Sequence, residues 1–380
     1  MPRKSLKVPV EPSVIKWAVK SSGWGIDEIS RKLDVNISTF NSWMDGRSSP
    51  TLNQVEKLSD SVKRPLAVFF LSEPPKEKPL PKDYRMLPGK EGDFDKKTIL
   101  AIRRARRLQK ISRQLSGNMN MTLRVNIPHR KLSESPKSIA QEYREAFGIT
   151  EDVQRKWKTP YESFNALRET IENMNIFVFQ IPMPVEDARG FTLVDDSPAT
   201  IVINSKDQIE ARIFSLMHEF GHVILDESGV SMPENVLFMR DGSSVEKWCN
   251  DFASEFLLPE KMVISVFSEM RDCLLETKTL NKLSRRYKVS KSMLLYNMVK
   301  LRYITNAQRD DVLSRPSKGG REDGFAALSA DKRCISEKGH KFVSLVATNI
   351  EKGHITHSDA LDYLSIKSKA LDKVTGGGKK

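Results

Sequence analysis

Cysteine, histidine and long apolar runs are all scarce in this chain of 380 residues, which has three cysteines and six histidines. The cysteines (Cys249, Cys273 and Cys334) show no C-x-x-C spacing. This excludes a disulfide framework and indicates a reducing compartment. The N-terminus has no apolar signal core, and runs such as 66–71 are too short to span a bilayer. We therefore expect a cytoplasmic protein that does not enter a membrane.

Acidic residues are also too few to balance the basic ones, which leaves a formal net charge of +13. Such an excess favours a polyanionic partner, with nucleic acid first, although a solvated basic surface is a common alternative. A chain of this length is too long for a single hydrophobic core, so two or three domains are expected.

Two of the six histidines, His218 and His222, stand four residues apart in the apolar stretch 215–225. At helical spacing they lie on one face and can bind one divalent metal ion. Glu219 lies at the edge of that face, where it can hydrogen-bond a water molecule without acting as a ligand. This is the H-E-x-x-H arrangement of a metalloprotease. The alternative is a pair of core histidines with ordinary hydrogen-bond partners.

A catalytic zinc site normally has three protein ligands, so a third ligand is expected on another element. The helix predicted over 245–259 offers Glu246, with Asn250 one turn further along the same face. Asn250 is then placed to hold the free N–H of a histidine. Glu255 is the rival ligand, and a rotation of this helix would favour it.

The pairing of these two helices resembles the ImmA/IrrE family of metallopeptidases over roughly 160–305. The shared features are Arg212-x-x-x-x-x-His218-Glu-Phe-Gly-His222 and Glu246-x-x-Cys249-Asn-x-Phe-Ala-x-Glu255-Phe-Leu-Leu-Pro259. The resemblance implies gluzincin-like chemistry, with Zn²⁺ bound by His218, His222 and Glu246. It also implies that Glu219 is the general base on the bound water, and that Arg212 and Asn250 support the ligands. Cys249 stands where the family commonly has alanine, so we interpret it as core packing.

Residues 12–71 predict a small helical bundle in which helices at 26–33 and 37–44 are joined by a tight turn at 34–36. Hydrophobic spacing places six side chains inward, namely Ile26, Ile29, Leu33, Ile37, Phe40 and Met44. This part resembles lambda-repressor-like (XRE-type) helix-turn-helix domains. The resemblance implies DNA binding, with Arg47 near a phosphate and a set of short polar side chains in the major groove: Ser38, Thr39, Asn41 and Ser42. The alternative is a helical bundle that makes protein contacts.

Runs of β-branched and aromatic residues predict strands at 176–181, 190–194 and 200–204. The last of these directly precedes the histidine helix, so we expect it to pair with extended substrate backbone. A basic helix at 96–115 carries two arginine pairs. They indicate a solvated or inter-domain face, or a stripe that follows phosphates.

The chain as a whole predicts a multidomain protein. An all-α helix-turn-helix domain (1–72) precedes an α+β zincin-like (gluzincin) metallopeptidase domain (159–305) and a small helical C-terminal region (325–380). A proline-rich linker (73–94) and a basic helical connector (95–158) separate the first two, and a second linker covers 306–324. A second helix-turn-helix-like segment (278–303) is expected to serve packing more than DNA binding. The histidines of the C-terminal region are expected at the surface: His340, His354 and His357.

These features predict a zinc-dependent endopeptidase that cleaves a protein partner. From the family resemblance, that partner would be a transcriptional repressor whose cleavage derepresses genes. One alternative is a DNA-binding regulator whose metal domain is a sensor or a structural module. Another is a regulatory protein of a toxin–antitoxin system or a mobile element. A homodimer is possible.

Overall fold

The computed structural model describes residues 6–83, 94–231, 244–315 and 328–375. The chain divides into two compact units. The first contains Met1–Leu80 and Gly92–Arg103, and the second contains Pro81–Glu91 and Arg104–Lys380. The 23-residue helix α5 (Lys96–Asn118) therefore belongs to both units. The C-terminal helices belong to the second unit. No described helix is both long and apolar enough to cross a membrane.

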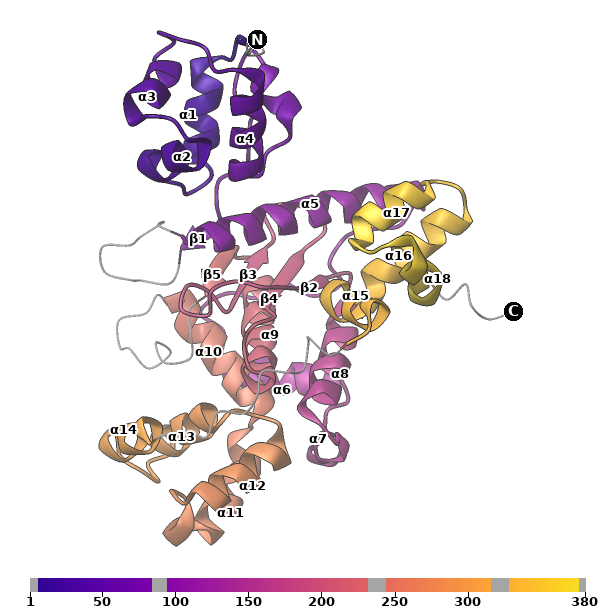
Figure 1. Cartoon of the computed structure of the whole chain (residues 1–380). Coiled ribbons are helices and arrows are strands. Elements are labelled where there is room, and N and C mark those ends of the chain that lie inside the picture. Colours follow the sequence, from indigo (N-terminus) through magenta and orange to yellow (C-terminus); the bar gives the residue numbers. More distant parts are fainter. Residues whose placement is uncertain (1–5, 84–93, 232–243, 316–327, 376–380) are drawn as a thin grey trace. The chain divides into compact units, whose positions relative to one another are not determined.

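The first unit has four α-helices and a 3-10 turn around its own core (Figure 1). They are α1 (Pro12–Lys20), α2 (Ile26–Leu33), α3 (Ile37–Met44), α4 (Leu52–Val62) and η1 (Leu66–Phe70). The turn after α2 uses Asp34 in a left-handed conformation, with φ of 55°. Ile29, Leu33, Phe40 and Met44 are buried as expected.

The inward placement of Ile26 and Ile37 is wrong, because their side chains are 37% and 50% exposed. Each is the first residue of its helix. Side chains on a helix lean toward its N-terminus. The side chain of the first residue therefore points beyond the end of the helix, away from the surface that packs against the neighbouring helices. Hydrophobic periodicity alone does not include this end effect.

The second unit is built on a five-stranded sheet with the order β1-β5-β3-β4-β2 (Figure 1). The strands are β1 (Lys82–Asp83), β2 (Phe177–Ile181), β3 (Gly190–Leu193), β4 (Thr200–Asn204) and β5 (Gly229–Ser231). Strands β2 and β4 are parallel, β3 is antiparallel to both β4 and β5, and β1 is parallel to β5. The three predicted strands are therefore confirmed, while β1 and β5 were not expected.

Helices surround this sheet. Those before the metal-binding motif are α6 (Pro136–Ala146), α7 (Glu151–Lys156) and α8 (Pro160–Asn173). The motif helix is α9 (Ile209–Ile224), and α10 (Ser244–Leu257) packs along it. The elements that follow are α11 (Glu260–Glu269), η3 (Arg271–Cys273), α12 (Thr277–Tyr287), α13 (Lys291–Lys300), α14 (Asn306–Ser314), α15 (Ala330–Lys338), α16 (His340–Glu351), α17 (His357–Leu364) and α18 (Ser368–Thr375).

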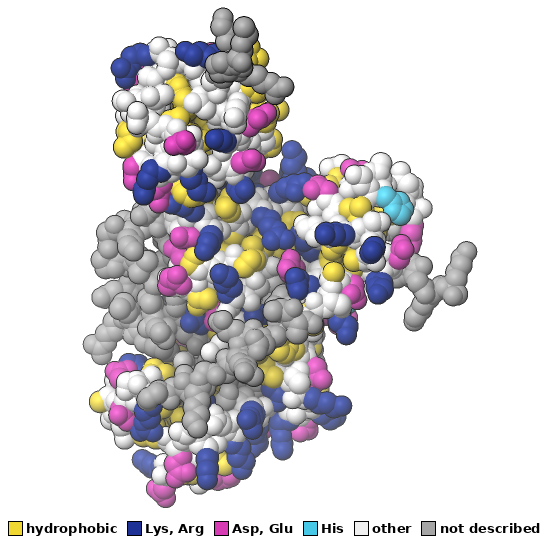
Figure 2. Space-filling view, viewed as in Figure 1, with side chains coloured by type: hydrophobic (Ala, Val, Ile, Leu, Met, Phe, Trp, Pro, Cys, Tyr) yellow, Lys and Arg dark blue, Asp and Glu magenta, His cyan; other side chains and the backbone are white. Residues whose placement is uncertain are grey.

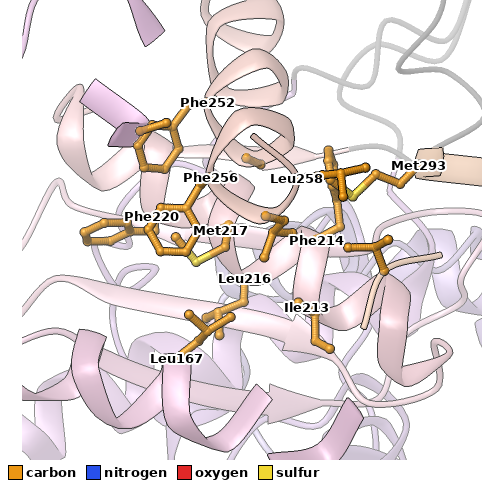
Figure 3. Close-up of a cluster of buried hydrophobic side chains, with 14 of the residues drawn as sticks. Leu167, Ile213, Phe214, Leu216, Met217, Phe220, Phe252, Phe256, Leu258 and Met293 are labelled. Atoms are coloured by element: carbon orange, nitrogen blue, oxygen red, sulfur yellow. The ribbon is translucent and has the colours of Figure 1, made fainter. Parts of the chain in front are cut away.

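The core of the second unit gathers around α9. Figure 3 shows Leu216, Met217 and Phe220 of α9 beside Phe252 and Phe256 of α10. The three phenylalanines are fully buried, and each contributes about 1.5–3 kcal/mol by its burial. Helix α13 joins the same core, and only its last residue, Lys300, is exposed. Helix α13 of the 278–303 segment is therefore largely packed into this core.

The arginines of α5 form ion pairs with other elements of the second unit. Within the second unit, Arg104 pairs with Glu337 at 3.4 Å and Arg106 pairs with Asp195 at 2.6 Å. Arg107 and Arg113 also have acidic partners, in α17 and in the loop after β3. Figure 2 likewise shows Lys and Arg side chains interspersed with acidic and apolar ones. Four arginines of this helix thus have acidic partners in the second unit.

Candidate metal centre

Helix α9 places its polar side chains in the middle of the core. Every residue from Ala211 to Ile224 is buried, including His218, Glu219 and His222. The helix packs against α8, α10, β3 and β4. Burial of three ionisable side chains is costly unless they have partners, so the geometry of this cluster decides its interpretation.

His218, His222 and Glu246 converge from α9 and α10, and we call these three side chains the metal cluster. The two Nε2 atoms are 3.2 Å apart. Glu246 places Oε2 at 3.3 Å from Nε2 of His218 and Oε1 at 3.0 Å from Nε2 of His222. The three side chains are buried, and one potential ligand atom from each lies within 4.8 Å of the others.

These distances fit a divalent metal ion. Ligand atoms placed about 2.0–2.2 Å from a tetrahedral ion lie roughly 3.3 Å from one another, which agrees with the spacing of the three side chains. Two imidazoles and one carboxylate are also the donor set of a catalytic zinc site with one open position. The metal cluster could therefore hold a metal ion.

The electrostatics of the cluster favour an ionised carboxylate. Burial alone would raise the pKa of Glu246, but His218 and His222 outweigh it and lower this pKa to about 2. Burial also tends to lower the pKa of His218, while Glu246, Glu219 and Asn250 raise it, and the net shift is upward. Glu246 is therefore charged at neutral pH, which is the form that binds a metal ion.

Glu219 is fully buried beside the metal cluster and is held by strand β3. The hydroxyl of Thr192 donates to Oε2 of Glu219 at 2.7 Å and to its backbone carbonyl at 3.1 Å. Gly190 makes room for the carboxylate, because a Cβ atom there would lie 2.9 Å from Oε1 of Glu219 and 3.0 Å from the carbonyl of Val202. Sequence reasoning missed both residues, since only the pairing of the strands brings them under α9.

The two candidates for the third ligand are clearly separated. Glu246 lies in the metal cluster, whereas Glu255 accepts a hydrogen bond from the backbone N–H of Glu260 at the start of α11. Asn250 lies one turn after Glu246 on α10, close enough to His218 to raise its pKa. Cys249 is fully buried and packs against Gly221, in agreement with a packing role.

Arg212 lies in the first half of α9. Its Nε donates to the carbonyl of Asp207 at 2.7 Å, and its Nη1 donates to Oε1 of Gln180 in β2 at 3.3 Å. These two bonds tie the beginning of the motif helix to the sheet, so the support that they give to the ligands is indirect.

The prediction that strand β4 pairs with the substrate is wrong. Strand β4 lies between β3 and β2, and both of its sides are already paired. An extended peptide cannot add to an interior strand. The sequence pattern of a buried strand does not reveal which strands are its neighbours.

The DNA-contact candidates lie on and after α3. Ser38, Thr39 and Arg47 are exposed, while Asn41 and Ser42 are half-buried. The hydroxyl of Ser42 donates to the carbonyl of Thr39 at 2.6 Å, and Arg47 pairs with Asp45 at 2.7 Å. The predicted surface histidines of the C-terminal region are exposed.

Residues 171–299 match the family model Peptidase_M78, described as an IrrE N-terminal-like domain. The match includes β2, β3, β4, β5, α9 and α10, and therefore the whole metal cluster. It supports a metallopeptidase-type domain of the ImmA/IrrE kind in this part of the chain. A comparison with curated proteins finds no match.

Proposed function

We propose that this protein is a zinc-dependent endopeptidase that cleaves a protein partner. The observation that carries the proposal is the convergence of His218, His222 and Glu246 at ligand spacing, next to a carboxylate outside the ligand set. The match to a peptidase family over the same residues supports it.

The residues of the site have separable roles. His218, His222 and Glu246 would hold the ion, which supplies Lewis acidity and brings a water molecule toward a neutral pKa. Glu219 would take the proton from the attacking water and deliver it to the leaving amine nitrogen. Thr192 donates a hydrogen bond to Oε2 and thereby orients the carboxylate. Gly190 leaves room for the carboxylate, because a Cβ atom there would lie 2.9 Å from Oε1.

Replacement of Glu219 by Gln tests this assignment. The amide keeps the size of the side chain but cannot accept the proton, so zinc content should be retained while peptide cleavage falls by at least about 100-fold. The measurement pairs metal analysis with cleavage of a pool of fluorescence-quenched peptides by the zinc-loaded protein. Cleavage at the wild-type rate would remove Glu219 as the base.

A second proposal concerns DNA. The exposed polar residues of α3 and the net charge of +13 support DNA binding by the first unit. Removal of one phosphate contact should reduce the slope of log K against log salt by about one. We expect this for Arg47→Ala but not for Arg271→Ala, which removes the same charge from the second unit. Equal slopes for both variants would contradict the role of Arg47.

The substrate that we infer is a transcriptional repressor, on the strength of the family resemblance. If the metal domain were instead a sensor or a structural module, Glu219→Gln would leave gene regulation unchanged. A reporter for the promoter of this protein's own gene, compared in wild-type and Glu219→Gln cells, separates these alternatives.

A further inference from the structure

The two outer edges of the described sheet are protected in different ways. Strand β2 lies at one edge, beside α15 (Figure 1). Arg168 donates to the carbonyl of Val178, and Gln180 donates to the carbonyl of Ser336 at 2.8 Å. These donors and acceptors are buried or half-buried, so this edge is closed by the fold itself.

Among the described residues, the opposite edge is covered by the backbone of Lys82–Asp83, at the end of the proline-rich segment. Strand β1 pairs in parallel with β5, with Lys82 opposite Gly229 and Asp83 opposite Val230. Two residues form a very short strand, and such a strand is marginal by itself. Pro81, directly before it, is buried, whereas the residues from 76 to 80 are exposed. In the described part of this segment, two paired residues and the buried proline before them thus mark its attachment to the sheet.

Strand pairing connects this edge of the sheet to the carboxylate of Glu219. Thr192 of β3 donates to Glu219, and Thr192 is also paired with Gly229 of β5. Gly229 in turn is paired with Lys82 of β1. A single row across the sheet therefore runs from the partner of Glu219 to Lys82, a distance of about 10 Å for two strand spacings.

Strand β5 also belongs to the connection between the two helices of the metal cluster. Helix α9 ends at Ile224, β5 begins at Gly229, and α10 begins at Ser244. A peptide that adds to β5 therefore binds to the stretch of chain that joins His222 to Glu246.

We propose that the outer edge of β5, on the side away from β3, is the surface to which an extended peptide substrate adds, and that Lys82–Asp83 occupies this edge as an intramolecular placeholder. The inference rests on the proposed peptidase function and names the regulation of the same site. Strand addition gives affinity through main-chain hydrogen bonds, which any extended peptide can offer. A two-residue placeholder is easily exchanged for a longer strand.

The burial of the metal cluster and Glu219 agrees with a state in which β1 occupies the edge of β5. His222 and Glu219 are fully buried, and His218 is 3% exposed. A peptide bond needs access to these side chains before it can be cleaved. Departure of β1 opens the strand position nearest to them on this side of the sheet.

The variant that tests the proposal is Lys82→Pro/Asp83→Pro. Two successive prolines remove both N–H groups, one of which faces β5 in a parallel ladder. The matched control is Lys76→Pro, which adds a proline to the same segment outside the pairing. The proteins are used as full chains loaded with zinc, and each is also prepared with Glu219→Gln for binding measurements.

In the active background, we expect the double variant to cleave a pool of fluorescence-quenched peptides about tenfold faster in kcat/KM than wild type, since the loss of one or two backbone hydrogen bonds has this scale. Lys76→Pro should leave the rate unchanged. In the Glu219→Gln background, hydrogen exchange of the Gly229–Ser231 amides should accelerate in the double variant. An excess of the same peptides should then slow this exchange again.

Faster exchange at β5 without faster cleavage, in proteins whose wild type cleaves, would overturn the proposal. If no protein cleaves the peptides, the peptidase function fails first. The exchange experiment still decides on the edge in that case, because peptides that do not protect Gly229–Ser231 in the double variant exclude β5 as their binding surface.

Discussion

The second unit contains two buried polar clusters that differ in their charge balance. The metal cluster and Glu219 bring together two carboxylates and two imidazoles. With neutral histidines, the formal charges are −1 and −1, which sum to −2. In the other, which we call the arginine cluster, Arg168 (+1) and Glu172 (−1) sum to zero. A divalent cation would balance the first set, and the second set needs none.

The arginine cluster is also satisfied by its own hydrogen bonds. Arg168 donates to Glu172 at 3.1 Å and to the carbonyl of Ser336 at 2.6 Å. Glu172 accepts from the backbone N–H of Lys341 at 3.2 Å, so it caps the start of α16, where negative charge is favourable. The comparison teaches that burial of charge alone does not identify a functional site. The metal cluster differs in that its potential ligand atoms converge and their charges are not balanced.

The largest expected effect concerns metal binding. His218→Ala removes one of the three ligands that we propose, so zinc affinity should fall by more than about 100-fold, beyond the loss seen when a supporting residue is removed. Metal analysis of the purified protein after dialysis measures this. Arg168→Met is the matched control and should retain zinc whenever it folds. Equal, negligible zinc in wild type and His218→Ala would remove the distinction between the two clusters.

The next effect concerns stability. Arg168→Met leaves Glu172 buried without its partner and should lower the free energy of unfolding by about 3–5 kcal/mol. Replacement of both residues, as Arg168→Met/Glu172→Leu, should recover part of this loss, because no unpaired charge remains. Urea denaturation of the variants provides the comparison. A double variant that is as unstable as the single one would show that packing, and not charge balance, dominates the arginine cluster.

Lys338, at the end of α15 beside the arginine cluster, should make the stability of the protein depend on pH. Its side chain is 2% exposed, and burial lowers its pKa from 10.5 to about 8, with Arg104 acting in the same direction. Below pH 8 the lysine is charged in both the folded and the unfolded protein, and burial of this charge lowers the free energy of unfolding. Between pH 8 and 10.5 the unfolded state binds more protons, so stability should rise with pH by up to about 3 kcal/mol.

The difference in unfolding free energy between wild type and Lys338→Met, followed from pH 7 to 10.5, isolates this contribution from other titrating groups. The methionine variant should be the more stable protein at pH 7, and the difference should shrink as the pH rises. A difference that does not change with pH would contradict the buried, titrating lysine.

The smallest effects concern two glycines, one beside each cluster. Gly339 has φ of +84°, and a Cβ atom there would lie 2.1 Å from Oε1 of Glu172. Gly339→Ala should therefore destabilise the protein by about 1–3 kcal/mol without a change in zinc content. Gly190→Ala should displace the carboxylate of Glu219 and lower cleavage more than stability. Thermal unfolding and peptide cleavage, measured on both variants, separate the two; reversed outcomes would contradict the roles assigned to the clusters.

Much of the metal centre could be predicted from the sequence because its signals are local. The four-residue spacing of His218 and His222 sets their common face, and the apolar residues around them predict burial. The choice between Glu246 and Glu255 stayed open, because it depends on how α10 is rotated against α9. Only the packing of the two helices decides it.

The features that escaped prediction depend on contacts between distant parts of the chain. Thr192 and Gly190 approach Glu219 only through the pairing of β3, and Arg168 meets Ser336 across 168 positions. Strand β1 has two residues within a proline-rich segment, which offers no strand signal. The position of β4 directly before the histidine helix also suggested the wrong role, since the sequence does not show that β4 is paired with β2 on one side and β3 on the other.

Helix α5 has a consequence for anyone who wishes to separate or exchange the two units. The first unit takes residues 92–103 from beyond the proline-rich segment, and Arg103 in this stretch donates to the carbonyls of Val62 and Ser21. A fragment that stops at residue 80 would leave those carbonyls without Arg103 and lose the buried side chains of Ile99 and Ile102. A chimaera joined at the prolines would therefore keep the core of the first unit but lose the contacts that α5 makes with it, among them that of Ile99 with Gly23.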